Sequence, residues 1–116
     1  MSRAEAEANL KFLNSAWQLS EDGRKLKRQY KFPDFISALK FVNEVGRIAE
    51  SEGHHPNIYL TWGKAEIEIY THAVGGLTEN DFILASKIDA LSSSPYMSVT
   101  DDSPSGDNNR ARRRQK

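Results

Sequence analysis

The chain has 116 residues, of which 38% are hydrophobic, enough for one modest core and a single domain. Its 16 Lys and Arg residues balance 16 Asp and Glu residues, so the overall charge argues neither for nucleic acid nor for a membrane surface as a partner. Cysteine is absent, which excludes disulfides, thiolate metal sites and a cysteine nucleophile.

From the sequence we expect neither a membrane span nor a secretory signal. No apolar run approaches the roughly 18–20 residues of a membrane span, and the N-terminus lacks the apolar segment of a secretory signal. We therefore expect no membrane partner and a cytoplasmic location, with nuclear and organellar locations left open.

The first elements that the sequence predicts are a short helix and a hairpin. Ser2 and Glu5 have the spacing of a capping box, which predicts a helix from there to about residue 13. Over residues 17–32, apolar residues alternate on both sides of the turn signal Asp22-Gly23, which predicts a β-hairpin.

A long helix and a second hairpin are predicted next. Residues 34–52 carry apolar side chains every three to four positions, and the helix should end near Gly53. Residues 58–72 alternate around a glycine turn, which predicts a hairpin whose Glu66 and Glu68 occupy a solvated face.

The last predicted helix covers residues 78–91, with Thr78 as its cap and Asp81 at the capping-box position. Residues 92–116 are rich in Ser, Asp and Asn, end in basic residues and show no periodicity, so we expect a disordered tail. The order α-β-β-α-β-β-α predicts an α+β domain over residues 1–91, a two-layer sandwich in which helices cover one face of a four-stranded antiparallel sheet.

All three histidines of the chain fall within one 19-residue window. His54 and His55 precede Pro56, which stiffens their backbone, and His72 stands at the end of a predicted strand. Imidazole exchanges protons near neutral pH, so such a group can carry acid and base catalysis. If the long helix continued, Glu50 would lie one turn before His54, where its carboxylate would fix the imidazole tautomer.

Other interpretations of these residues stay open at this point. Histidines are often ordinary surface groups, Trp62 either offers an aromatic face to a flat ligand or packs on the sheet, and Asp81 with Glu79 fits the first turn of a helix. A zinc site is disfavoured because the H-E-x-x-H pattern is absent and adjacent histidines on extended backbone do not easily share an ion. A serine hydrolase is disfavoured because there is no G-x-S-x-G motif.

The spacing of seven residues, together with the segment THAVGGLTENDFILASKID, resembles the signature of the pterin-4a-carbinolamine dehydratases. The seven positions are Glu50, His54, His55, Pro56, Trp62, His72 and Asp81. The likeness covers about residues 5–91. It implies a dehydratase that converts 4a-hydroxytetrahydrobiopterin to quinonoid dihydrobiopterin and water, with the pterin as substrate and with no metal or organic cofactor.

The resemblance also implies roles for individual residues. His54 and His72 match the proton-transferring histidines, Glu50 would orient His54, and His55 matches the histidine that chiefly holds substrate. The substrate-binding positions are then His55, Pro56, Trp62, Thr71, Ala73 and Asp81.

Partners and alternative functions follow from the same likeness. We expect a homodimer or homotetramer, and the likeness also allows a protein partner, either an aromatic amino acid hydroxylase or a transcription factor. One alternative is a non-catalytic dimerisation or coactivator module for a transcription factor. Another is a pterin-binding role in molybdenum cofactor metabolism, which would use the same pocket.

Overall fold

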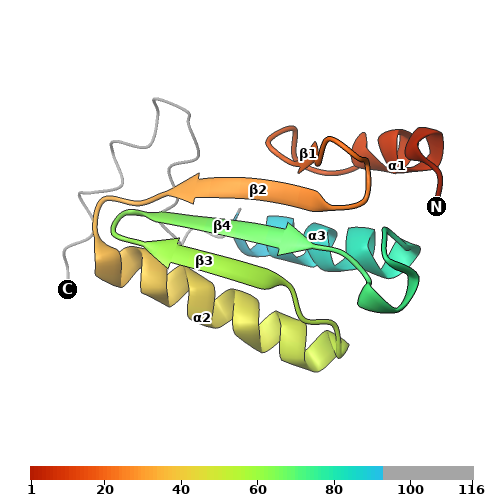
Figure 1. Cartoon of the computed structure of the whole chain (residues 1–116). Coiled ribbons are helices and arrows are strands. Elements are labelled where there is room, and N and C mark those ends of the chain that lie inside the picture. The colour runs from red at the N-terminus through yellow and green to blue at the C-terminus, as the bar shows by residue number, and fades with distance from the viewer. Residues whose placement is uncertain (93–116) are drawn as a thin grey trace.

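The computed structural model describes residues 1–92, so the tail predicted beyond them lies outside the described residues. The elements in chain order are α1 (Arg3–Leu10), β1 (Gln18–Leu19), β2 (Leu26–Lys31), α2 (Phe35–Glu52), β3 (Asn57–Thr61), β4 (Lys64–Ile69), the 3-10 helix η1 (His72–Val74) and α3 (Glu79–Ser92). The predicted order of helices and strands is confirmed, and η1 is an addition to it (Figure 1).

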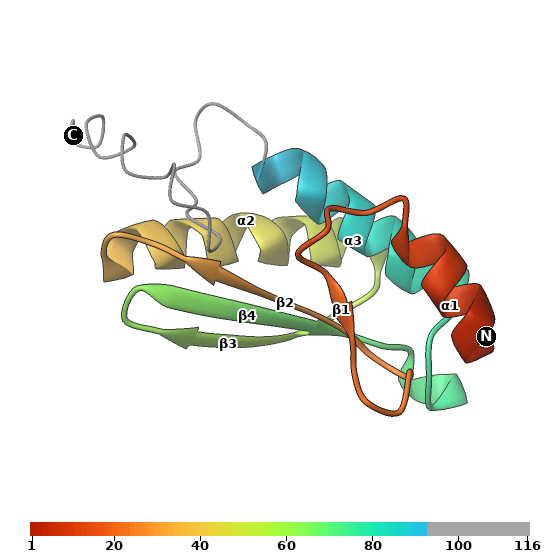
Figure 2. The ribbon, with the colours of Figure 1, turned by 90° about the horizontal axis from the view of Figure 1, so that it is seen from above.

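The four strands form one antiparallel sheet in the order β1-β2-β4-β3. β2 and β4 pair along their full length, from Leu26 opposite Ile69 to Lys31 opposite Lys64. Figure 2 shows the helices on one side of this sheet, which leaves the other face of the sheet without a helical layer. The predicted α+β, two-layer architecture is therefore confirmed.

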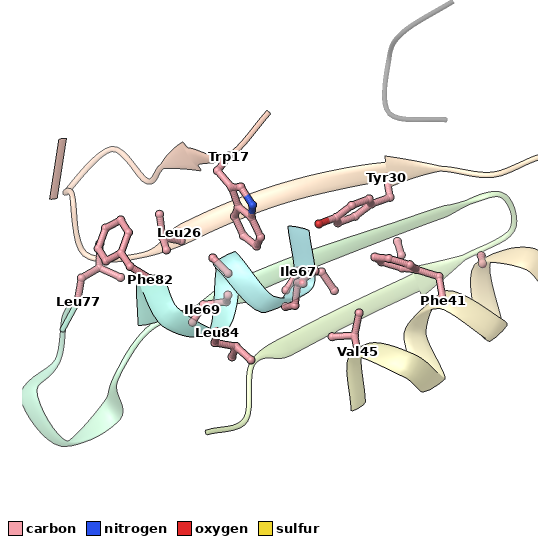
Figure 3. Packing of buried hydrophobic residues seen from close by; sticks show 14 of the residues in the cluster. Trp17, Leu26, Tyr30, Phe41, Val45, Ile67, Ile69, Leu77, Phe82 and Leu84 are labelled. Atoms are coloured by element: carbon pink, nitrogen blue, oxygen red, sulfur yellow. The ribbon is translucent and has the colours of Figure 1, made fainter. Parts of the chain in front are cut away.

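The core lies between the sheet and the helices α2 and α3 (Figure 3). Phe41 of α2 packs its ring 4.5 Å from the ring of Tyr30 and 5.4 Å from the ring of Phe32, measured between centroids. Burial of each such side chain stabilises the fold by roughly 1.5–3 kcal/mol. The alternation predicted for β2 explains why its side chains reach the core, because every second residue of the strand points toward the helices.

One charged side chain shares that buried face. Arg28 lies in β2 between two apolar core residues and is only 3% exposed. Its guanidinium contacts Asp89 of α3 at 2.9 Å, and the indole Nε1–H of Trp17 donates to the same carboxylate at 2.8 Å. This cluster fastens α3 to the sheet, and the sequence pattern did not predict it.

The helix ends follow the capping signals in the sequence. Ser2 and Glu5 form the predicted capping box of α1, although the helix ends at Leu10 and not near residue 13. Asp34 caps α2 by accepting a hydrogen bond from the N–H of Ser37 at 2.8 Å. Within residues 1–92 no helix has both the length and the apolar character needed to span a membrane.

The expectation of a solvated face for both glutamates of β4 is wrong for Glu68, whose exposure is only 7%. Asn57 of the neighbouring strand donates to its carboxylate at 2.9 Å, and the ammonium groups of Lys25 and Lys27 lie 3.9 Å from it. Cross-strand partners therefore cover a position that alternation alone assigns to solvent.

Candidate active site

The C-terminus of α2 sets the directions of the histidine pair. Gly53 adopts φ +65°, a left-handed conformation that glycine reaches without a Cβ penalty. Its N–H donates to the carbonyl of Glu50 at 3.2 Å, and the N–H of His54 donates to the carbonyl of Ala49 at 3.1 Å. These two bonds form a Schellman motif, which ends the helix and turns the chain into extended backbone.

His54 points toward the start of α3. Its Nε2 contacts Oδ1 of Asp81, whose side chain is fully buried, while the histidine ring keeps 19% of its surface exposed. A carboxylate on one ring nitrogen fixes the imidazole tautomer and stabilises the charged ring. This contact leaves Nδ1 as the ring nitrogen of His54 that can exchange a proton with a ligand.

The second carboxylate oxygen of Asp81 accepts hydrogen bonds from two further segments. Oδ2 accepts hydrogen bonds from the hydroxyl of Thr71 at 2.9 Å and from the backbone N–H of Thr78 at 2.7 Å. The hydroxyls of these two threonines are 3.1 Å apart. Asp81 therefore joins the segment after α2, the end of β4 and the first turn of α3 at one buried carboxylate.

His55 points away from this cluster, as alternation on extended backbone requires. Its Nε2 lies 2.9 Å from Oε1 of Glu50, and both side chains are well exposed. The expected pairing of Glu50 with His54 is therefore wrong. The helix does not continue past Glu52, and the turn at Gly53 brings the second histidine, not the first, back to the carboxylate.

His72 begins η1, directly after the residue that binds Asp81. A bridge between Thr71 and Gly76 closes the turn that contains it. The imidazole is exposed at this turn, and its ring centroid lies 4.3 Å from that of Tyr70, with the two planes tilted by 45°. Its position thus depends on a short turn and an aromatic neighbour.

The remaining predicted positions lie at different distances from this cluster. Pro56 is half-buried beside the histidine pair, and Ala73 is exposed in η1 next to His72. Trp62 is 73% exposed at the tip of the β3–β4 hairpin. The five residues of β3 lie between His55 and Trp62, and at about 3.3 Å per residue this strand alone spans roughly 16 Å. Within this chain the fold does not bring Trp62 to the histidines.

For two residues of the cluster, the sequence pattern does not indicate a place in the site. Thr78 was identified only as a helix cap, yet its N–H and hydroxyl help to hold Asp81. Tyr70 belongs to no motif, but its position two residues before His72 on an extended segment is a signal that the two rings share one side.

The arrangement offers acid and base groups and no obvious metal cage. In the part of the chain that the structure describes, no group of three or more His, Asp or Glu side chains is placed to hold a metal ion. His54, tied to a buried carboxylate, and His72, beside Tyr70, both lie at the end of the sheet where β3 begins and β4 ends, and each imidazole can give or accept a proton.

Comparison with known proteins places the chain in a family. The family described as pterin 4 alpha carbinolamine dehydratase matches residues 1–91. The chain belongs to this family. A protein from Rickettsia canadensis, named as a candidate pterin-4-alpha-carbinolamine dehydratase, is 48% identical over 90 residues, which cover 78% of this chain and 82% of that protein. A protein of the same name from Halorhodospira halophila is 56% identical over 75 residues, 65% of this chain and 69% of that one.

Solved structures agree with this membership. A protein from Brucella melitensis described as a transcriptional coactivator/pterin dehydratase matches with a TM-score of 0.72 and 30% identity, over 78% of this chain and 96% of that one. A pterin dehydratase-like protein described as a RuBisCO assembly factor in the alpha-carboxysome matches with a TM-score of 0.58 and 21% identity, over 68% of this chain and 92% of that one. The second likeness concerns the fold alone.

Proposed function

We propose that this chain is a dehydratase that converts 4a-hydroxytetrahydrobiopterin to quinonoid dihydrobiopterin and water. In this reaction the C4a–O bond breaks, a proton joins the departing oxygen, and the proton on N5 leaves as the N5–C4a double bond forms. Atoms and charge balance without a redox partner, so one acid and one base are sufficient. Each such group contributes typically about 10²–10⁴-fold to the rate.

The observation that carries the proposal is the contact of His54 with the buried carboxylate of Asp81. A surface histidine needs no such partner, and a carboxylate fully removed from water needs donors for both oxygens. Asp81 finds those donors in the histidine and in two threonines, one of which directly precedes His72. The same carboxylate therefore orients one histidine and anchors the segment that carries the other.

This arrangement supports the following assignment of roles. His54 exchanges a proton through Nδ1, because Nε2 is held by Asp81. His72 supplies the second proton-transferring group from the turn after β4. His55, which is exposed and paired with Glu50, serves to hold the substrate and not to move protons. Glu50 then acts on substrate binding through His55.

The test is the rate of dehydration of freshly generated 4a-hydroxytetrahydrobiopterin, followed by ultraviolet absorbance. His54→Ala and His72→Ala should each lower kcat by about 10²–10⁴-fold, the range of a lost acid or base. His55→Ala should mainly raise KM and serves as the matched histidine control. Wild-type turnover no faster than the spontaneous reaction would refute the enzymatic assignment.

A second candidate is a protein-binding role, alone or beside catalysis. It is favoured by the description of the Brucella melitensis protein as a coactivator and by exposed apolar side chains at the start of α2, where Ile36 is 70% and Phe35 is 41% exposed. We infer self-association into a homodimer or homotetramer through such surfaces. Light scattering on the purified chain tests it, and a monomer at micromolar concentration would contradict it.

A further inference from the structure

We propose that Tyr70 is a positioning residue for His72 and that Lys25 holds the ring of Tyr70 in place. The inference rests on the proposed function, in which His72 exchanges a proton with the substrate. It concerns two residues outside the histidine motif that no step of the reaction uses directly.

His72 lacks the fixing contact that His54 has. Within residues 1–92 no hydrogen bond or ion pair reaches the His72 side chain, whereas the His54 ring is tied to Asp81. The ring of Tyr70 contacts His72 in place of a hydrogen-bond partner. Thr71 between the two rings is extended, at φ −101° and ψ 108°, so Tyr70 and His72 project to the same side and their centroids come to 4.3 Å.

Lys25 contacts the ring of Tyr70. Its Nζ lies 4.8 Å from the centroid of the Tyr70 ring and 3.9 Å from a carboxylate oxygen of Glu68. An ammonium over an aromatic face is attracted by the negative π-surface, which restrains both groups. Since Glu68 is almost fully buried and fixed by Asn57, it anchors the lysine to the sheet. A chain of contacts thus runs from the sheet through Lys25 and Tyr70 to the imidazole.

Such a chain matters for catalysis because proton transfer needs the donor and acceptor in line at short distance. An imidazole on an exposed turn can otherwise rotate about its side-chain bonds, and a misplacement of about 1 Å can cost around 10²-fold in rate. The loss should fall on kcat, because the ground-state complex is held mainly by other groups. The contact needs an aromatic ring at residue 70 and does not need the phenol hydroxyl.

The kinetic experiment compares Tyr70→Leu with Tyr70→Phe in the full chain. Tyr70→Leu keeps apolar bulk but removes the ring, and should lower kcat about 10- to 100-fold with KM changed less than about threefold. Tyr70→Phe should restore kcat to within about threefold of wild type. Tyr59→Leu, at an exposed tyrosine of β3, is the matched control and should leave both constants unchanged.

A second readout does not depend on activity. Because the chain has three histidines, its imidazole proton signals can be assigned with single His→Gln variants. The ring current of Tyr70 should displace the His72 signals. Tyr70→Leu should return them toward the position of free histidine, while Tyr70→Phe keeps them displaced and the His54 signals stay in place in both variants.

The outcomes separate the two proposals. An inactive wild type would refute the proposed function, and the spectra would still decide whether the Tyr70 ring packs against His72 in solution. An active wild type with unchanged kcat in Tyr70→Leu, or with unmoved His72 signals, would overturn the positioning role. If Tyr70→Leu does not fold, Lys25→Met carries the test. It should lower kcat about two- to fivefold and shift the His72 signals in the same direction, and no change in either would overturn the inference.

Discussion

Replacement of Asp81 by asparagine probes the centre of the site while its shape is kept. The amide oxygen of Asn can still accept from Thr71 and Thr78, but its NH₂ group then faces Nε2 of His54 as a donor. Nε2 of His54 must then accept this hydrogen bond with its lone pair, so the ring carries its proton on Nδ1. Asp81→Asn therefore reverses the tautomer and blocks the nitrogen that should accept a proton.

The size of the effect follows from these contacts. Hydrogen bonds to a charged group contribute about 1.5–3 kcal/mol and neutral ones about 1 kcal/mol. The hydrogen bonds from the Thr71 hydroxyl and the Thr78 N–H are retained at the lower, neutral value, so we expect a loss of about 2 kcal/mol in the free energy of unfolding. For a fold of this size that corresponds to a decrease in Tm of roughly 8–16 °C. If His54 has the proposed role, its wrong tautomer should lower kcat by about 10²–10⁴-fold.

The assay combines three measurements on the same variant. Dehydration kinetics give kcat, urea unfolding gives the stability, and ¹⁵N chemical shifts of the imidazole give the tautomer of His54. Glu79→Gln is the matched control, since it removes an exposed carboxylate from the same turn of α3 and should change neither kcat nor the tautomer. A folded Asp81→Asn protein that keeps wild-type kcat and a proton on Nε2 would refute the reasoning.

Three further predictions concern stability. Gly53→Ala should destabilise the fold by about 1–2 kcal/mol in urea unfolding because a Cβ disfavours φ +65°, and an unchanged midpoint would contradict this. Asp89→Ala should cost about 3–5 kcal/mol by leaving Arg28 buried beside a lost carboxylate, whereas Asp89→Asn should cost less in the same measurement. The N–H and hydroxyl of Ser2 hold the pKa of Glu5 below its usual value of 4.5, so the cap of α1 is complete above that pH and weakens as the pH falls through the lowered pKa. An NMR titration of the Glu5 carboxyl that shows the usual pKa would count against the capping box.

Local patterns in the sequence predicted the helices and strands and indicated several residues of the candidate site. Capping signals at Ser2 and Asp34, the apolar stripe before Gly53 and the alternation in both hairpins act within a few residues, so each can be recognised without the fold. The motif likewise indicated Asp81, which contacts His54 although the two residues are 27 positions apart in the chain.

The rest depended on contacts that no local pattern contains. The pairing of Arg28 with Asp89 joins residues 61 positions apart, and alternation only indicates that Arg28 faces inward. The burial of Glu68 depends on Asn57 of another strand. Glu50 contacts His55 and not His54, the partner that the sequence predicts. The left-handed conformation of Gly53 determines which of the two adjacent histidines reaches this carboxylate.

The meeting of three segments at Asp81 also bears on how the proposed activity should return when the unfolded chain is refolded. The β3–β4 hairpin closes locally, but the contact of His54 with Asp81 encloses that whole hairpin and requires α3 to have docked. Loops of this length close more slowly than a tight turn, and their closure gains nothing until the far ends meet. Recovery of turnover should therefore trail recovery of secondary structure, which makes the His54 imidazole a late reporter of folding.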